Sequence, residues 1–138
     1  MRDRVFSLDA EERRRTAEAL SAALRAESDV VFAYLHGSFL ADLDFHDIDV
    51  AVYLDAPEAQ YLRRIVELAD RLSNAVGFPV DVRPLNAAPV PFAFRALQGE
   101  LLIVRDEDRL GRVLDEVGAR YLDIAPVLRR ATREAFAS

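Results

Sequence analysis

Apolar residues along this chain follow two patterns, short continuous runs and longer stretches at helical spacing. The runs favour buried strands because they are short and rich in Val, Leu and Ile, and they predict strands over residues 30–35, 47–54, 79–85 and 101–104. Helical spacing predicts helices over about residues 9–27, 57–76, 89–98 and from 106 onward, with a last helix after residue 126. This order predicts an α/β (α+β) fold, in which a mixed β-sheet is flanked by helices in a single domain.

Residues with capping or chain-breaking properties mark the ends of several predicted elements. Asp9 and Glu12 have the spacing of a capping box at the start of the first helix. Gly77 follows the last apolar position of the second helix, where a C-terminal cap is expected. Pro84 indicates the end or edge of a strand, and Pro126 separates the last helix from the one before it.

Composition limits the kinds of function that the chain can have. The 138 residues carry a formal net charge of -6, which disfavours general nucleic-acid binding because such binding needs a basic surface. All apolar runs are too short to cross a bilayer, so no membrane insertion is expected. The absence of cysteine excludes disulfides, thiolate zinc sites and cysteine nucleophiles, and it makes the cytoplasm the expected location.

Two aspartates stand at the start of the second predicted strand. Asp47 and Asp49 are two residues apart, so their side chains project from the same face. Carboxylates this close repel each other, and oxygen ligands on a rigid strand suit Mg²⁺. Asp81 lies on the next predicted strand. If the two strands are neighbours, the three carboxylates converge and can hold one or two Mg²⁺ ions, and Asp81 can accept the proton of an attacking hydroxyl.

Gly37 and Ser38 directly follow the first predicted strand. Glycine allows the backbone to approach a phosphate closely, and serine offers a hydroxyl and a backbone N–H to phosphate oxygens. Nucleotidyl transfer requires such a phosphate cradle beside a metal cluster, and this order of motifs supplies both. Other polar residues near the motifs are assigned to packing, to the solvated surface or to surface ion pairs: His36, His46, Asp42, Asp44, Arg83 and Arg95.

This ordered set of motifs resembles the minimal nucleotidyltransferases of the polymerase-β superfamily. The resemblance covers most of the chain from about residue 30 onward, and it rests on HGS at 36–38, DIDVAVYL at 47–54, VDV at 80–82 and similar stretches at 84–104 and 121–126. It implies a nucleotidyltransferase-like fold for a single domain over residues 1–138. Within that domain, a catalytic core over about residues 28–105 is expected to precede C-terminal helices over about 106–136.

The resemblance also implies a role for each motif. Asp47 and Asp49 bind Mg²⁺, and Asp81 completes the metal site. Gly37 and Ser38 hold the triphosphate of an NTP, with ATP as the implied donor of AMP. Many proteins of this kind resemble the antitoxin of a toxin–antitoxin pair, which implies a helical HEPN toxin as partner and one of its tyrosines as acceptor. The chain is then expected in a homo- or hetero-oligomer.

Two alternative functions remain open from the sequence. Eight residues, 39–46, separate the Gly-Ser motif from Asp47, and members of the family commonly have a longer spacer. This shortening motivates a non-catalytic antitoxin that keeps the fold and neutralises its partner by contact. The second alternative is an adenylyltransferase for a small molecule of the aminoglycoside type, although such enzymes usually carry an added substrate domain.

Overall fold

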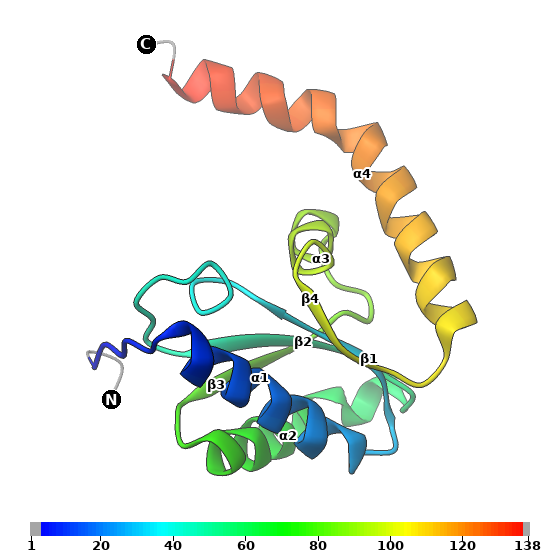
Figure 1. Cartoon of the computed structure of the whole chain (residues 1–138). Helices are drawn as coiled ribbons and strands as arrows, with labels where there is room; N and C mark the ends of the chain where they lie inside the picture. Colours follow the sequence, from blue (N-terminus) through cyan, green and yellow to red (C-terminus); the bar gives the residue numbers. More distant parts are fainter. Residues whose placement is uncertain (1–3, 137–138) are drawn as a thin grey trace.

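A four-stranded mixed sheet forms the centre of the molecule, as predicted (Figure 1). The computed structural model describes residues 4–136, with Phe136 described by its backbone alone, so the outer limits of the domain predicted over 1–138 lie outside this part. The strands are β1 (Val30–His36), β2 (Ile48–Leu54), β3 (Val80–Pro84) and β4 (Glu100–Val104), in the order β3-β2-β1-β4. β1 pairs antiparallel with β2 and β4, whereas β2 and β3 run parallel.

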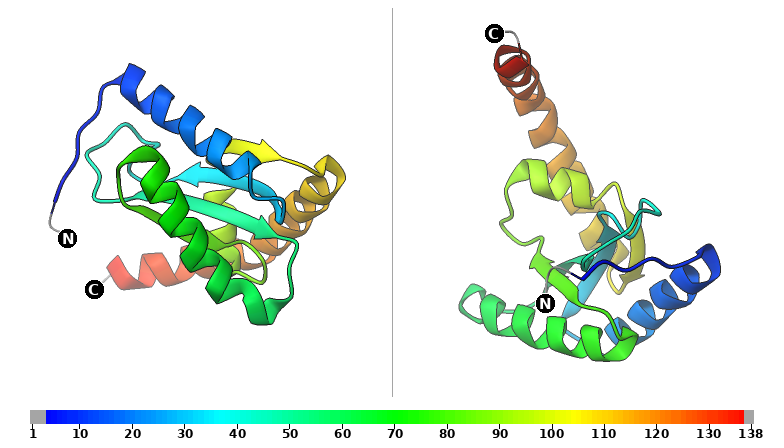
Figure 2. Two further views of the ribbon diagram at one scale, coloured as in Figure 1. Left: turned by 90° about the horizontal axis from the view of Figure 1, so that it is seen from below. Right: turned by 90° about the vertical axis from the view of Figure 1, so that its left-hand side faces the viewer.

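Helices cover the two faces of the sheet in pairs (Figures 1 and 2). α1 (Ala10–Arg25) and α2 (Tyr61–Val76) bury Leu20, Leu24, Leu68 and Leu72 against one face. α3 (Val90–Ala96) and the start of α4 (Glu107–Phe136) cover part of the other face. Alternation along β2 assigns its side chains to these faces, because Val50 and Val52 belong to the first core and Ala51 to the second.

Helix ends follow the predicted capping chemistry closely. The capping box of α1 is confirmed, since the Asp9 side chain accepts from the Glu12 N–H and the Glu12 side chain accepts from the Asp9 N–H. Gly77 ends α2 with a left-handed φ of 79°. The predicted helix over 57–76 begins instead with a 3₁₀ turn, η1 (Glu58–Gln60), before α2.

Arg105, just after β4, joins that strand to the C-terminal end of α1. Its Nε donates to the Val30 carbonyl at 2.9 Å, and its Nη2 donates to the Arg25 carbonyl at 2.6 Å. The same Nη2 also donates to the Leu24 and Glu27 carbonyls, both at 3.1 Å. One guanidinium thus binds carbonyls at the C-terminal end of α1, in the turn after it and at the start of β1.

The C-terminal part of the chain differs from the prediction, because α4 is one helix of 30 residues instead of two helices. Pro126 lies inside it. Proline removes one helical hydrogen bond and favours a bend, which an exposed helix can tolerate because water satisfies the freed carbonyl. Figure 1 shows α4 bending along its length and extending away from the sheet. None of the helices within residues 4–136 combines the length and the apolar character of a membrane span.

Candidate active site

Two of the predicted site residues, Asp49 and Asp81, lie side by side at the end of the sheet where β1, β2 and β3 meet. In the register of the strands Asp49 stands opposite His36 of β1 and opposite Asp81 of β3. The neighbours of Asp49 in β2, Ile48 and Val50, point into the core beneath α1 and α2. Asp49 therefore faces the opposite side of the sheet, the side on which α3 lies.

Asp47 lies just before β2 and not within it, because the strand begins at Ile48 and not at residue 47 as predicted. Its side chain is half-buried in a bend of the chain. After burial, the negative charge of Asp47 is a further cause of the raised pKa of Asp49. The two aspartates are thus neighbours at the end of the sheet, although only Asp49 is held by strand pairing.

Gly37 packs directly against the carboxylate of Asp49. Its φ is 83°, a left-handed conformation that glycine adopts without strain. A Cβ at this position would lie 3.0 Å from Cγ of Asp49 and closer still to Oδ2. Only glycine fits here, so the predicted phosphate motif and the predicted metal ligand form one site.

The turn after Gly37 presents free backbone donors. The Ala41 N–H donates to the Gly37 carbonyl at 3.1 Å, and the Leu43 N–H donates to the Ser38 carbonyl at 3.1 Å. The N–H groups of Ser38, Phe39 and Leu40 donate no hydrogen bond within the described chain. Ser38 itself is exposed at the start of this turn. Such a set of unused N–H groups is a suitable site for phosphate oxygens.

Electrostatics at the site favour a bound cation. Burial, together with the negative charges of Asp47 and Asp81, raises the pKa of Asp49 to about 6, against a smaller opposing effect of Arg83. Burial and the positive charge of Arg83 lower the pKa of His36, so its ring is neutral at physiological pH. The groups that could bind a cation here are therefore carboxylates. The Asp49 carboxyl is costly to ionise unless a positive charge lies nearby.

The predicted convergence of the Asp47, Asp49 and Asp81 carboxylates into one metal site is not seen among the described residues. Within residues 4–136, no group of three His, Asp or Glu side chains is close enough to hold a metal ion. Asp81 is paired with Arg83, whose Nε lies 3.2 Å from its Oδ2. Arg83, predicted to form a surface ion pair, is 61% exposed but pairs inside the candidate site. Its guanidinium also lies over the Phe92 ring of α3, 5.6 Å from the ring centre.

Sequence reasoning missed two residues that shape this site. Phe92 contacts Arg83 and meets the His36 ring edge-on at 5.6 Å between ring centres. Arg13 of α1 binds the turn that follows Gly37 by donating to the Phe39 and Leu43 carbonyls, which are distant from it in sequence. A signal for Arg13 exists, since it shares the helical spacing of Leu20 and Leu24, and a charged residue on an apolar face suggests a buried partner. No comparable signal marks Phe92.

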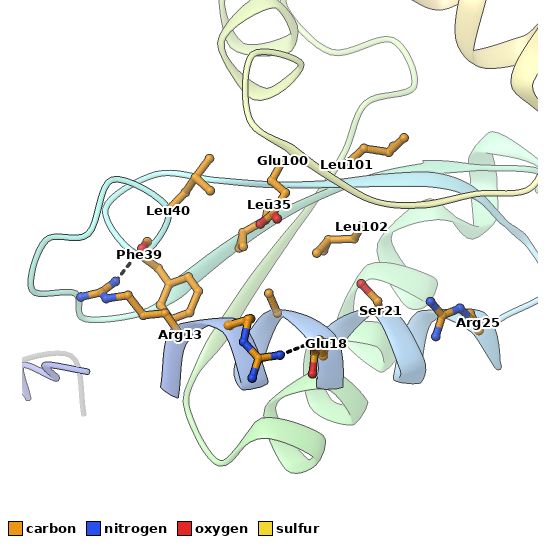
Figure 3. A pocket seen from close by; sticks show the side chains of 12 residues that line it. Arg13, Glu18, Ser21, Arg25, Leu35, Phe39, Leu40, Glu100, Leu101 and Leu102 are labelled. Atoms are coloured by element: carbon orange, nitrogen blue, oxygen red, sulfur yellow. Dashed lines mark hydrogen bonds and ion pairs between the residues drawn. The ribbon is translucent and has the colours of Figure 1, made fainter. Parts of the chain in front are cut away.

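A separate groove of about 480 Å³ lies between α1, β4 and the turn at Phe39 (Figure 3). It includes none of the predicted site residues. Its charged side chains are of both signs, and Phe39 and Leu40 of the turn also line it. The charged residues are Arg13, Arg14, Arg25, Glu18 and Glu100. The end of the sheet is the better candidate site, because it combines the free N–H groups of the turn with carboxylates that can hold a cation beside a triphosphate.

Comparisons with known proteins identify the family of the chain. The model of the family described as polymerase beta, nucleotidyltransferase matches residues 18–108, more than half of the chain. This segment contains every predicted site residue. No curated protein matched the sequence.

Several solved structures share the fold. One is a chain of the complex between a tri-AMPylated Shewanella oneidensis HEPN toxin and MNT antitoxin, with 17% identity over 87% of this chain and 98% of that chain and a TM-score of 0.58. A chain of a toxin–antitoxin structure with AMP-PNP has 18% identity, covers 84% and 98% of the two chains and gives a TM-score of 0.60. A chain of the MntA–HepT pair has 17% identity over 86% and 98%, with a TM-score of 0.58.

At these identities the likeness to solved structures shows a shared fold, whereas the family model covers the fold and the motifs together. The chain belongs to the polymerase-β nucleotidyltransferase family.

Proposed function

We propose that this protein transfers AMP from ATP to a tyrosine hydroxyl of a HEPN-type toxin and acts as the antitoxin of that pair. The packing of Asp49 against Gly37 and beside Asp81 carries the proposal, because it unites a phosphate-binding turn with paired carboxylates. The catalytic core corresponds to about residues 28–105. Action on ATP and on such a toxin places the reaction in the cytoplasm.

The residues at the end of the sheet fit Mg²⁺. Burial and two neighbouring carboxylates raise the pKa of Asp49 to about 6, and a cation would relieve this cost. Carboxylate oxygens on a strand suit Mg²⁺, which keeps several waters and binds substrate phosphates. Asp47 and Asp49 would hold one or two ions, and Asp81 would complete the site. When bound, Mg²⁺ neutralises the charge that builds up on the phosphates.

The residues of the chain position the reactants. The free N–H groups of Ser38, Phe39 and Leu40 are suited to hold the β- and γ-phosphate oxygens. The acceptor oxygen then bonds to the α-phosphorus, and the bond from that phosphorus to the bridging oxygen breaks, so pyrophosphate leaves. Asp81 takes the proton of the acceptor hydroxyl, which requires its carboxylate to leave Arg83.

A protein partner is supported by the exposed part of α4. Leu122 is 74% exposed and Val127 is 58% exposed on α4. Figure 2 (right) shows this helix extending away from the sheet. The Tyr121 side of this helix stacks on Phe94 of α3. Apolar side chains that stay exposed on a helix commonly mark an interaction surface. The complex of a tri-AMPylated HEPN toxin with MNT antitoxin shows that a protein of the same fold assembles with such a toxin. A HEPN toxin is therefore the proposed partner.

Transfer of label tests the proposal. The protein is incubated with a HEPN toxin, Mg²⁺ and ATP labelled at the α-phosphate, and label on the toxin is measured. We expect label on a toxin tyrosine, and we expect Asp49→Asn to reduce its rate at least about 100-fold. The exposed Asp70→Asn on α2 is the matched control, with an unchanged rate.

The same assay separates the proposal from the non-catalytic alternative. Toxin that is neutralised without label, equally by the wild type and by Asp49→Asn, would show that the protein acts by contact alone. The absence of a preassembled three-ligand cluster within residues 4–136 is the observation that favours this second candidate.

A further inference from the structure

One arginine of α1, Arg13, forms hydrogen bonds to the backbone of the turn that follows Gly37. Arg13 Nη1 donates to the Phe39 carbonyl at 2.5 Å, and its Nη2 donates to the Leu43 carbonyl at 2.8 Å. Its Nε donates to the Leu8 carbonyl at 3.1 Å and lies 2.8 Å from Oδ1 of Asp42. Figure 3 shows this side chain reaching from α1 to the backbone at Phe39.

The environment of Arg13 makes these contacts strong. Its side chain is only 11% exposed. The guanidinium lies over the rings of Phe39 and Phe45, 5.1 Å and 5.6 Å from their centres. A buried guanidinium between aromatic rings is screened little by water, so its hydrogen bonds and its cation–π contacts count more than they would at the surface.

The geometry of the peptide group links these contacts to the free donors. The carbonyl of one residue and the N–H of the next point in opposite directions across a trans peptide. Because Arg13 fixes the Phe39 carbonyl on the α1 side, the Leu40 N–H is directed away from α1. That N–H is one of the free donors of the turn, and Asp49 also faces away from α1.

Besides Arg13, the turn is held by the buried Phe39 side chain, which packs edge-on against Phe45, and by a few backbone bonds. Its own backbone bonds near Gly37 are the two that end at Ala41 and Leu43, together with one from Asp42 to Phe39 at 3.3 Å. The spacer from the Gly-Ser motif to Asp47 is only eight residues long. Arg13 adds to this set two hydrogen bonds and one ion pair from outside the spacer.

We infer that Arg13 is a positioning residue that holds the Gly37–Leu43 turn in the conformation that binds the phosphates of the nucleotide. This inference rests on the proposed function and adds a residue of α1 to the machinery of the site. Arg13 acts through the carbonyls of Phe39 and Leu43 and does not touch the substrate. Its loss should weaken nucleotide binding more than it slows the chemical step.

The test compares Arg13→Gln and Arg13→Lys with Arg14→Gln, an exposed neighbour that pairs only with Glu11 and Glu18 among the described residues. KM for ATP and kcat are measured in the label-transfer assay, and amide hydrogen exchange is measured without nucleotide. For Arg13→Gln we expect KM for ATP to rise at least about tenfold with kcat within about threefold, because ground-state nucleotide binding is lost. The Ala41 and Leu43 amides should exchange at least about tenfold faster, while those of α2 stay unchanged.

Arg13→Lys should fall between the wild type and Arg13→Gln, and it carries the test if Arg13→Gln does not fold. Arg14→Gln should match the wild type. An unchanged KM for ATP with unchanged exchange of the turn would overturn the inference, and so would faster exchange spread evenly over the turn, α1 and α2. If the wild type transfers no label, the proposed function fails, and the exchange data alone still decide whether Arg13 holds the turn.

Discussion

Asp49 combines burial with two like-charged neighbours, and its pKa of about 6 makes the stability of the protein depend on pH. An acid with a raised pKa in the folded state stabilises the fold most below its unfolded pKa, and this contribution is lost as the pH rises through about 6. Without divalent cations, we expect Asp49→Asn to increase the free energy of unfolding by about 1 kcal/mol at pH 7.5, after allowing for screening of a half-exposed group. At pH 4 the gain should vanish.

Urea unfolding at the two pH values checks this prediction, with Asp70→Asn as the control. Mg²⁺ should stabilise the wild type and not Asp49→Asn, because the cation offsets the repulsion only where the carboxylate is present. Equal stability of the wild type and Asp49→Asn at pH 7.5 would show that the Asp49 carboxylate is not under strain.

Gly37 and Gly77 offer a matched pair for testing the close approach of the backbone to Asp49. Both have left-handed φ angles, 83° and 79°, but only Gly37 has a side chain in the space that a Cβ would fill. Each Gly→Ala change should cost about 1 to 2 kcal/mol of stability from the backbone alone. Gly37→Ala should also displace the Asp49 carboxylate and reduce the rate of label transfer at least about 100-fold, whereas Gly77→Ala should leave it intact. Equal rates for the two variants would contradict the packing described for Gly37.

At the scale of the elements, Arg105 connects β4 with the end of α1 and with the start of β1. We expect Arg105→Gln to reduce the free energy of unfolding by about 2 kcal/mol, because charge-assisted bonds to several carbonyls are lost together. Arg112→Gln, an exposed change on α4, should alter stability by less than about 0.5 kcal/mol. Thermal or urea unfolding measures both, and equal effects of the two changes would mean that the Arg105 contacts add no stability.

Most elements could be predicted because their signals are local. These signals are the short apolar runs of the strands, the capping box at Asp9 and the glycine at position 77. Each depends on residues within a few positions of each other. The prediction around Pro126 was wrong because a proline signals a break, although a helix exposed to water can bend and continue. Strand register, which sets Asp49 opposite Asp81, is a tertiary property. From the sequence, the two residues could be predicted to meet only if their strands were neighbours.

Within the candidate site the same distinction holds. Gly37, Ser38 and the aspartates were recognisable as ordered motifs. The part played by Arg13 was not, because its partners Phe39 and Leu43 lie 26 and 30 residues away. The pairing of Arg83 with Asp81 likewise depends on side-chain positions that no motif encodes.

At the scale of the whole molecule, α4 reaches beyond the sheet and its helices. Its 30 residues have a length of about 45 Å measured along the bent helix axis, and Leu122 and Val127 are exposed on it. We expect Leu122→Asp with Val127→Asp to weaken binding of the HEPN toxin at least about tenfold, with little change in the stability of the isolated protein. Leu62→Asp is the control, since Leu62 is 78% exposed on α2. The effect is measured by titrating each variant with the toxin. Loss of binding only in Leu62→Asp would place the interface on α2 and not on α4.

The most direct test of the account is a crystal structure of the protein with Mn²⁺ and a non-hydrolysable ATP analogue. We predict anomalous signal from manganese beside Asp47 and Asp49, with Asp81 turned from Arg83 toward it and phosphate oxygens on the N–H groups of Ser38 and Leu40. Nucleotide bound instead in the groove between α1 and β4, with no manganese at Asp49, would contradict the account.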